Sequence, residues 1–404
     1  METAREVHSV CIGIWVKVGS RDESPEKNGI SHFLEHMFFK GTGSRSAEGI
    51  AMEIDSLGGE LNAFTSSEYT VFYIKVLDEY TDQAVELLSD IFMNSTFPAE
   101  DLEKEKNVVN EEINMVEDTP SDYVHELFNR NIWGEEGLGQ SVLGKRETLN
   151  ALTRDDLIDH IDRNYDADNI VIACSGNLRE NQLTGYLNDT FGRTKKSKAQ
   201  RTVILPEYNS GRNIVSKDLS ETHICLGLKG MQYNSEERYS LHLLNTILGS
   251  GFSSRLFQNV REKRGLVYSI YSYHVSYFDA GLWSVYAGAD RKNANEVIDI
   301  TINEMRNLSR SITAEELQRA KAQLKGNLIL ALESTSNKMT NIAKQEIYYG
   351  KYFSPPEILK MVEAITLEEV KKLSSRLIED KPFALTTYGP VKEADLKEAC
   401  KLLK

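Results

Sequence analysis

The stretch SHFLEHMFFKGTG, residues 31–43, places charged and metal-ligating side chains inside an apolar segment. Its Phe, Leu and Met residues predict a helix that packs into a hydrophobic interior. Because residues three and four apart share a helix face, His32, Glu35 and His36 should converge on one patch. Such groups are expensive to bury unless they bind something. The alternative is a pair of ordinary packed or surface histidines.

Composition narrows the class of protein. The chain has 404 residues, 40% of them hydrophobic and 27% charged, which suits a globular protein of two or three domains. A net charge of −14 argues against nucleic acid and anionic membranes as partners, and it would attract basic peptides. No apolar run is long enough to span a bilayer. Scattered cysteines and the absence of a signal-like start favour a bacterial-type cytoplasmic location.

The order of elements repeats along the chain. A strand predicted at 8–19 leads to the helix with HFLEH (32–36), and a strand near 221–230 leads to a helix with HLLNT (242–246). We therefore expect two duplicated domains, 1–200 and 201–404. The polar stretch 194–213 is the expected linker.

A second helix supports the patch through its periodicity. In AEDLEKEKNVVNEEINMVED, residues 99–118, the inward stripe is expected to include Glu105 and Glu112 among apolar residues. A buried carboxylate without a partner is costly, so these two should be paired or bound to a cation. The corresponding positions of the second repeat hold Ala320 and Asn327. Only the first copy thus keeps the charged groups.

These residues suit a hydrolytic zinc site. Such sites take three protein ligands from histidine and carboxylate and keep a fourth position for water. His32, His36 and Glu112 would bind one Zn²⁺ per chain. Glu35 would take a proton from the zinc-bound water and hand it to the leaving amine, while Glu105 would orient a ligand or the water.

The chain resembles the M16 metallopeptidases, which carry the inverted zinc motif HxxEH. The likeness rests on NGISHFLEHMFFKGT (28–42), ELNAFTSSEYTVFY (60–73) and EKEKNVVNEEINMVEDTP (103–120). It is strongest toward bacterial processing-protease-like members and the β subunit of the mitochondrial processing peptidase. The resemblance implies an α+β fold of two domains, each a mostly antiparallel sheet with helices on one face, in a dimeric clamshell. It assigns the third ligand to Glu112 and the supporting glutamate to Glu105.

The resemblance also assigns residues of the second half. SGFSSRLFQNVREKRGLVYSIYSY, residues 250–273, is similar to the family segment whose Arg and Tyr reach the reacting carbonyl, here Arg261 and Tyr268. Both can donate to an oxyanion. Alternatively, they belong to a basic surface loop and an ordinary strand. Because one chain carries both the zinc motif and this segment, we expect a homodimer in which the pair completes the partner's site.

Substrate contacts are implied more weakly. The resemblance places Phe39 at the substrate, and it places Asn62 and Ala63 on an edge strand that pairs with extended peptide. Asp122 and Glu126 match acidic positions that would recognise a basic residue near the cleavage site. The alternatives are a turn residue at Asn62 and a solvated acidic face at 122–126.

The expected function is a zinc metalloendopeptidase acting on unstructured or presequence-like peptides. Two alternatives stay open: a non-catalytic scaffold subunit that keeps the fold, and a catalytic subunit that needs a distinct partner chain. Members of this family usually open with an additional strand before the one expected at 8–19. This chain starts almost at that second strand, so we expect that its true N-terminus is uncertain.

Overall fold

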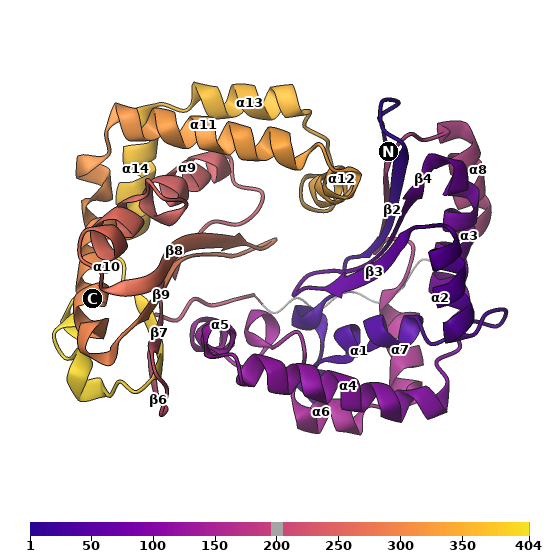
Figure 1. The fold of residues 1–404 in the computed structure, drawn as a ribbon, viewed down its shortest axis with the longest axis horizontal. Coiled ribbons are helices and arrows are strands. Elements are labelled where there is room, and N and C mark those ends of the chain that lie inside the picture. The colour runs from indigo at the N-terminus through magenta and orange to yellow at the C-terminus, as the bar shows by residue number, and fades with distance from the viewer. Residues whose placement is uncertain (195–204, 404) are drawn as a thin grey trace. The chain divides into compact units, whose positions relative to one another are not determined.

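Figure 1 shows a computed structural model of the chain, which describes residues 1–194 and 205–403. The described residues form two compact units. Of the described residues, the first unit comprises 1–115, 136–194 and 330–352, and the second comprises 116–135, 205–329 and 353–403. Half of the expected linker, residues 195–204, and the expected boundary at residue 200 lie outside the described residues, so both stay predictions.

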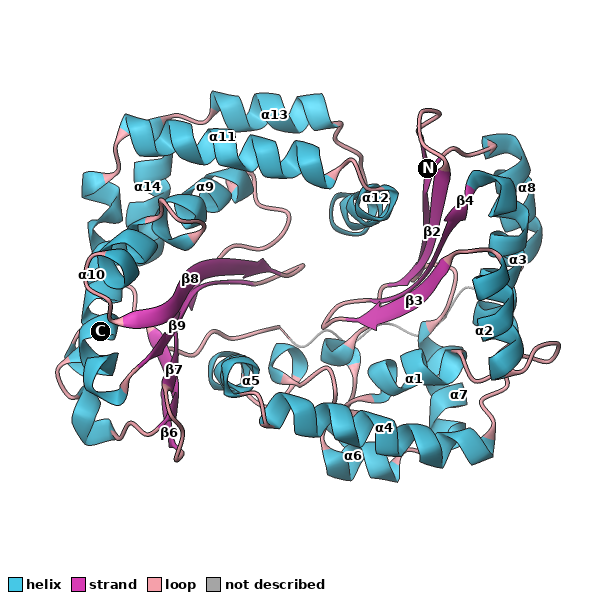
Figure 2. Cartoon of the chain, viewed as in Figure 1, coloured by secondary structure: helices cyan, strands magenta, loops and turns pink. Residues whose placement is uncertain are grey.

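The first unit is built on a five-stranded sheet in the order β1-β5-β2-β4-β3. Figure 2 shows β2, β4 and β3 of this sheet side by side. Its strands are β1 (Glu2–Thr3), β2 (Ser9–Val16), β3 (Glu60–Thr65), β4 (Thr70–Leu77) and β5 (Ile170–Gly176). β1 and β5 are parallel, and the other neighbours are antiparallel. The strand expected at 8–19 is present as β2, but it is buried on both faces and not on one as its alternating pattern predicts. Ile12 and Ile14 lie in the hydrophobic core, and Cys11 and Trp15, which point to the opposite face, are fully buried as well.

Helices cover both faces of this sheet, and the larger group packs on the core face. That group comprises α1 (Ile30–Phe38), α2 (Ala47–Ser56), α3 (Thr81–Asn94), α4 (Ala99–Glu117), α6 (Arg146–Ala151), α7 (Arg154–Asn164) and α8 (Glu180–Phe191). The opposite face takes α12 (Thr335–Tyr349), which contacts β2 and β5. A Cβ on Gly13 of β2 would meet Met339 Sδ of α12 at 2.5 Å, so a larger residue here would force the Met339 side chain to shift.

The second unit repeats the plan with a sheet in the order β6-β10-β7-β9-β8. Its strands are β6 (Arg212–Ser216), β7 (Thr222–Lys229), β8 (Val267–Ser276), β9 (Gly281–Ala289) and β10 (Ala384–Gly389). The core-side helices are α9 (Arg238–Gly249), α10 (Ala294–Ser311), α11 (Ala314–Ala331), α13 (Pro355–Ala364) and α14 (Leu367–Ile378). On the other face, α5 (Pro120–Trp133) packs against β7 and β10.

The two units confirm the duplication expected from the sequence. In each, the first strand is parallel to the last, and the remaining strands are antiparallel in the same order. Each sheet also takes one covering helix from the other half of the sequence, α12 in the first unit and α5 in the second. The additional opening strand is present as β1, which has two residues where its counterpart β6 has five. No helix among the described residues is long and apolar enough to cross a membrane.

Candidate metal centre

The helix α1 is held at its first turn by a buried carboxylate. Its N-cap, Gly29, has φ +97°, which glycine adopts without strain. Glu23 accepts hydrogen bonds from the backbone N–H groups of Gly29 (2.7 Å) and Ser31 (2.8 Å), and from the Asn28 side chain (2.9 Å). These bonds satisfy donors that a helix start leaves free. Burial raises the pKa of Glu23 to about 7, although the three bonds oppose the rise.

His32, His36 and Glu112 come together as the sequence predicts. Each offers one ligand atom, and these atoms all lie within 4.8 Å of one another. His32 Nε2 lies 3.4 Å from Glu112 Oε2, and His36 Nε2 lies 3.6 Å from Glu112 Oε1. Among the described residues, this is the one group of three or more such side chains that could hold a metal ion. Two imidazoles and one carboxylate are the donor set of many hydrolytic zinc sites, so the residues fit Zn²⁺.

The electrostatics of the three side chains suit a cation. Burial and the neighbouring His36 lower the pKa of His32 to about 4, which keeps its imidazole neutral at pH 7. A hydrogen bond from His36 lowers the pKa of Glu112, which keeps it a carboxylate. Burial acts to lower the pKa of His36, but bonds and charges from Glu112 and Glu105 outweigh it and raise that pKa. Glu112 thus presents a negative charge to two ring nitrogens.

Glu105 lies behind His36, as predicted from the helix periodicity. Its Oε2 atom lies 3.2 Å from His36 Nδ1, which orients the other ring nitrogen, Nε2, toward Glu112. The ammonium of Lys40, in the turn that follows α1, lies 2.6 Å from Glu105 Oε1. Glu105 is buried, so Lys40 compensates a charge that would otherwise be isolated.

Glu35 lies beside the ligands on the same helix. Burial raises its pKa, and a hydrogen bond from Thr65 acts in the opposite direction. Thr65 Oγ1 donates to Glu35 Oε2 at 2.6 Å. Thr65 is the last residue of β3, so the edge strand directly contacts the carboxylate predicted to act as the general base.

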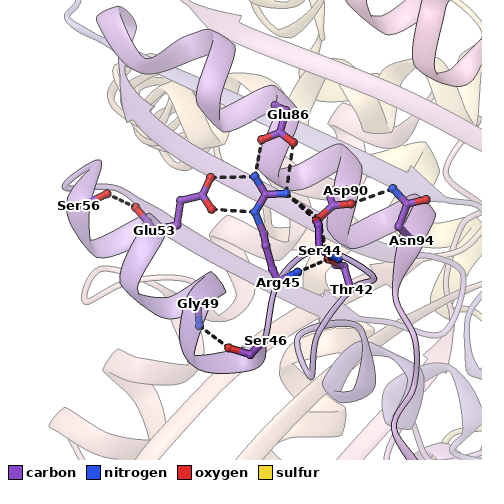
Figure 3. A network of polar contacts seen from close by, with 10 residues as sticks. All are labelled: Thr42, Ser44, Arg45, Ser46, Gly49, Glu53, Ser56, Glu86, Asp90 and Asn94. Atoms are coloured by element: carbon purple, nitrogen blue, oxygen red, sulfur yellow. Dashed lines mark hydrogen bonds and ion pairs between the residues drawn. The ribbon is translucent and has the colours of Figure 1, made fainter.

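The chain that leaves α1 is tied to α2 and α3 by a polar network around Arg45 (Figure 3). The guanidinium contacts Glu53 of α2 (2.7 Å), Glu86 of α3 (2.6 Å) and Asp90 of α3 (2.7 Å). Asp90 also accepts from Thr42 at 2.7 Å. The Arg45 guanidinium thus binds three carboxylates from two helices, which fixes the position of the segment that follows α1.

The predicted substrate residues of the first unit lie on or near its edge strand. Asn62 is exposed on β3, and its side-chain oxygen accepts from the Ala63 N–H at 2.8 Å. β3 pairs on one side with β4 and ends the sheet on the other. Phe39 is the C-cap of α1, half-buried, with its ring 6.3 Å from that of Phe72. The roles of these three residues in binding a peptide stay predictions.

The remaining predicted residues belong to the second unit. The Arg261 guanidinium lies over the Tyr268 ring, 5.7 Å from its centroid, and Tyr268 is 80% exposed at the start of β8. Asp122 and Glu126 lie one turn apart on α5, and Asp122 is exposed. The role of Arg261 and Tyr268 in contacting the reacting carbonyl stays a prediction. So does the role of Asp122 and Glu126 in recognising a basic residue.

The second unit has lost the metal ligands at the matching place. His242 of α9 packs edge-on against His274, with ring centroids 4.1 Å apart. Asn245, opposite Glu35 in the repeat, accepts a hydrogen bond from Trp283 Nε1 at 3.1 Å. Ala320 is buried in α11 in place of a supporting carboxylate. Aromatic packing therefore occupies the position that the first unit uses for charged groups.

Sequence reasoning missed four residues that support this centre: Glu23, Lys40, Arg45 and Thr65. Lys40 had a local signal, since it lies only four residues after His36, just beyond the end of α1. Glu23 lies before a Gly-started helix, where a carboxylate is favourable. Arg45 and Thr65 act across contacts that the sequence pattern does not reveal.

The fold and the ligand set define a metallopeptidase-like protein with one charged and one degenerate repeat. Comparison with family models agrees: residues 1–146 match "Insulinase (Peptidase family M16)", and residues 151–324 match "Peptidase M16 inactive domain". The chain belongs to peptidase family M16.

Similar proteins cover nearly the whole chain. The uncharacterized zinc protease YmxG of Bacillus subtilis is 43% identical over 96% of this chain and 95% of its own length. The uncharacterized zinc protease SCO5738 of Streptomyces coelicolor is 38% identical over 99% of this chain and 88% of its own.

Two solved structures share the fold. An M16 inactive-domain protein from Pseudomonas fluorescens has a TM-score of 0.89 at 20% identity, covering 96% of this chain and 94% of that one. A chain of complex III₂ from Candida albicans has a TM-score of 0.87 at 22% identity, covering 100% of this chain and 96% of that one.

Proposed function

We propose that this chain is a zinc-dependent endopeptidase that cuts unstructured peptides. The observation that carries the proposal is the convergence of His32, His36 and Glu112, with Glu35 beside them on the same helix. The names of the two bacterial relatives, both zinc proteases, support the metal and the class of reaction.

The chain's own residues suit peptide hydrolysis. Zn²⁺, when bound, would supply Lewis acidity that polarises a carbonyl and makes water more acidic. Glu35 would accept the proton of the attacking water and deliver it to the leaving amine, so its raised pKa brings it closer to a working general base. Glu105 and Lys40 would keep His36 in a fixed orientation.

The edge strand supports an extended peptide as the substrate. β3 ends its sheet, and a peptide that adds as a further strand would lie alongside the helix that bears Glu35. Strand addition needs backbone hydrogen bonds and no free terminus, which favours cleavage within a chain. Ala63 N–H, now bonded to the Asn62 side chain, would be available once that side chain turns away.

Charge favours basic substrates. The chain carries a net charge of −14, and Asp122 and Glu126 form an acidic pair on α5. We propose that this pair selects peptides with a basic residue near the cleavage site. We also propose a homodimer in which Arg261 and Tyr268 of one protomer donate to the developing oxyanion in the other.

A scaffold role is the second candidate, because a chain of complex III₂ from Candida albicans shares the fold. The retained ligands argue against it, because His32, His36 and Glu112 still form a complete metal-binding set with Glu35 beside them on the same helix. A subunit that needs a distinct partner chain would show no activity when purified alone.

Cleavage of a mixed pool of unstructured peptides, read by mass spectrometry, tests the proposal. Native protein supplied with zinc should cut, and Glu35→Gln should bind zinc without cutting. Glu111→Gln, next to the ligand but exposed on α4, is the matched control and should cut like native protein. If native protein cuts no peptide, the endopeptidase proposal fails for this chain alone.

A further inference from the structure

We propose that Thr65 orients Glu35 for proton transfer, and that a buried group of Arg21, Glu68 and Tyr348 holds Thr65 in place. The inference rests on the proposed peptidase function and adds positioning residues to it. Each step depends on contacts within the first unit.

The contact between strand and base is short and direct. Thr65 Oγ1 donates to Glu35 Oε2 at 2.6 Å, which is typical of a hydroxyl bonded to a carboxylate. Fixing one oxygen restricts rotation of the carboxyl group. A carboxylate has about four lone-pair positions, so a single hydrogen bond leaves capacity to accept a proton. Thr65 can therefore orient the base without blocking it.

The turn that follows Thr65 is anchored by backbone contacts. The carbonyl oxygen of Ser66 accepts from Ser20 N–H at 3.2 Å, and that of Ser67 accepts from Arg21 N–H at 3.0 Å. A Cβ on Gly19 would lie 2.2 Å from the Ser66 oxygen, so only glycine allows the two segments to approach so closely. The end of β3 is thus fixed against the chain that follows β2.

Buried side chains hold the same turn from two directions. Arg21 Nη1 lies 2.5 Å from Glu68 Oε1, and the Tyr348 hydroxyl donates to Glu68 Oε2 at 2.7 Å. Arg21, Glu68 and Tyr348 are each less than 9% exposed. Tyr348 belongs to α12, which comes from the second half of the sequence. Because a buried charge is tolerated only with its partners in place, this group permits one arrangement of the turn.

A set of near-isosteric substitutions tests the role of the Thr65 hydroxyl. Thr65→Val should lower kcat roughly 10- to 100-fold, as expected when a catalytic group loses its orientation. KM and the zinc dissociation constant should stay within about threefold of native values, because neither the ligands nor the outer edge of β3 changes. Thr65→Ser keeps the hydroxyl and should restore most of the activity.

The chain offers a matched control on the neighbouring strand. Thr70 pairs directly opposite Thr65, and its hydroxyl donates to the Val18 carbonyl at 3.1 Å. Thr70→Val should therefore leave kcat unchanged. Tyr348→Phe removes one bond to Glu68 and should lower kcat several-fold while zinc affinity stays constant.

The metal-free protein gives a test that does not depend on activity. The thermal midpoints of Thr65→Val, Glu35→Ala and the double variant should be non-additive, because the two residues touch. Additive shifts, or a Thr65→Val enzyme with kcat within twofold of native, would overturn the positioning role. So would a Thr65→Ser enzyme as impaired as Thr65→Val. If native protein cleaves no peptide but the thermal midpoints of the three variants are non-additive, the contact between Thr65 and Glu35 stands and the proposed function is refuted.

Discussion

Glu23 makes the stability of the first unit depend on pH in a direction that can be calculated. Its buried carboxyl has a pKa raised by burial from the ordinary 4.5 to about 7, against the opposing bonds from Asn28, Gly29 and Ser31. The folded protein therefore binds this proton more tightly than the unfolded chain does. The stabilisation is fully present below about pH 4.5 and is lost as the pH rises through about 7.

A shift of about 2.5 pKa units corresponds to about 3 kcal/mol. Glu23→Gln has no carboxyl at this position, so the difference in unfolding free energy between native protein and variant isolates the titration. The unfolding free energy of native protein minus that of Glu23→Gln should fall by about 3 kcal/mol between pH 4.5 and pH 8. Any constant cost of the misplaced amide cancels from the pH dependence.

Urea unfolding of metal-free protein at a series of pH values, followed by circular dichroism, measures the difference. Glu48→Gln is the control, because Glu48 lies in the first turn of another helix of this unit and is exposed. Its curve should follow that of native protein. A flat difference for Glu23→Gln would refute the effect of burial, and a difference that rises with pH would mean that the three donors outweigh it.

Three further outcomes follow from the contacts around the centre. Lys40→Met should weaken zinc binding roughly tenfold, measured by competition with a chelator, because Glu105 would lose the cation that holds it against His36. Equal zinc affinity would show that the contact from Lys40 to Glu105 does not support His36. Arg45→Met should destabilise metal-free protein by about 1–3 kcal/mol in urea unfolding, because three carboxylates lose a shared donor; an unchanged midpoint would contradict this. Gly13→Ala should cost about 1 kcal/mol in the same assay, because the buried Met339 side chain must move, and a neutral effect would show that this side chain repacks without cost.

The metal ligands could be predicted because they obey a local period. His32 and His36 lie four apart on α1, and Glu105 and Glu112 lie seven apart on α4. In the structure Glu105 is buried, and Glu112 is half-exposed at the position where the three ligands meet. Periodicity shows which residues share a face, and the cost of burying charge shows that the two faces must meet.

The supporting contacts could not be predicted, because they join segments far apart in the chain. Nothing local to Glu68 indicates that Tyr348 will donate to it, and nothing in the first half indicates that α12 will cover β2. The same holds for α5, whose sequence is amphipathic but does not say which sheet it covers. Pattern fixes the buried face of a helix, whereas its partner depends on the packing of the whole unit.

Zinc content and cleavage measured together on one variant pair test the central claim most directly. Native protein and Glu111→Gln should each bind one zinc per chain and cut unstructured peptides, whereas Glu112→Gln should lose tight zinc binding and cleavage together. Full zinc occupancy with full activity in Glu112→Gln would contradict the assignment of the metal centre.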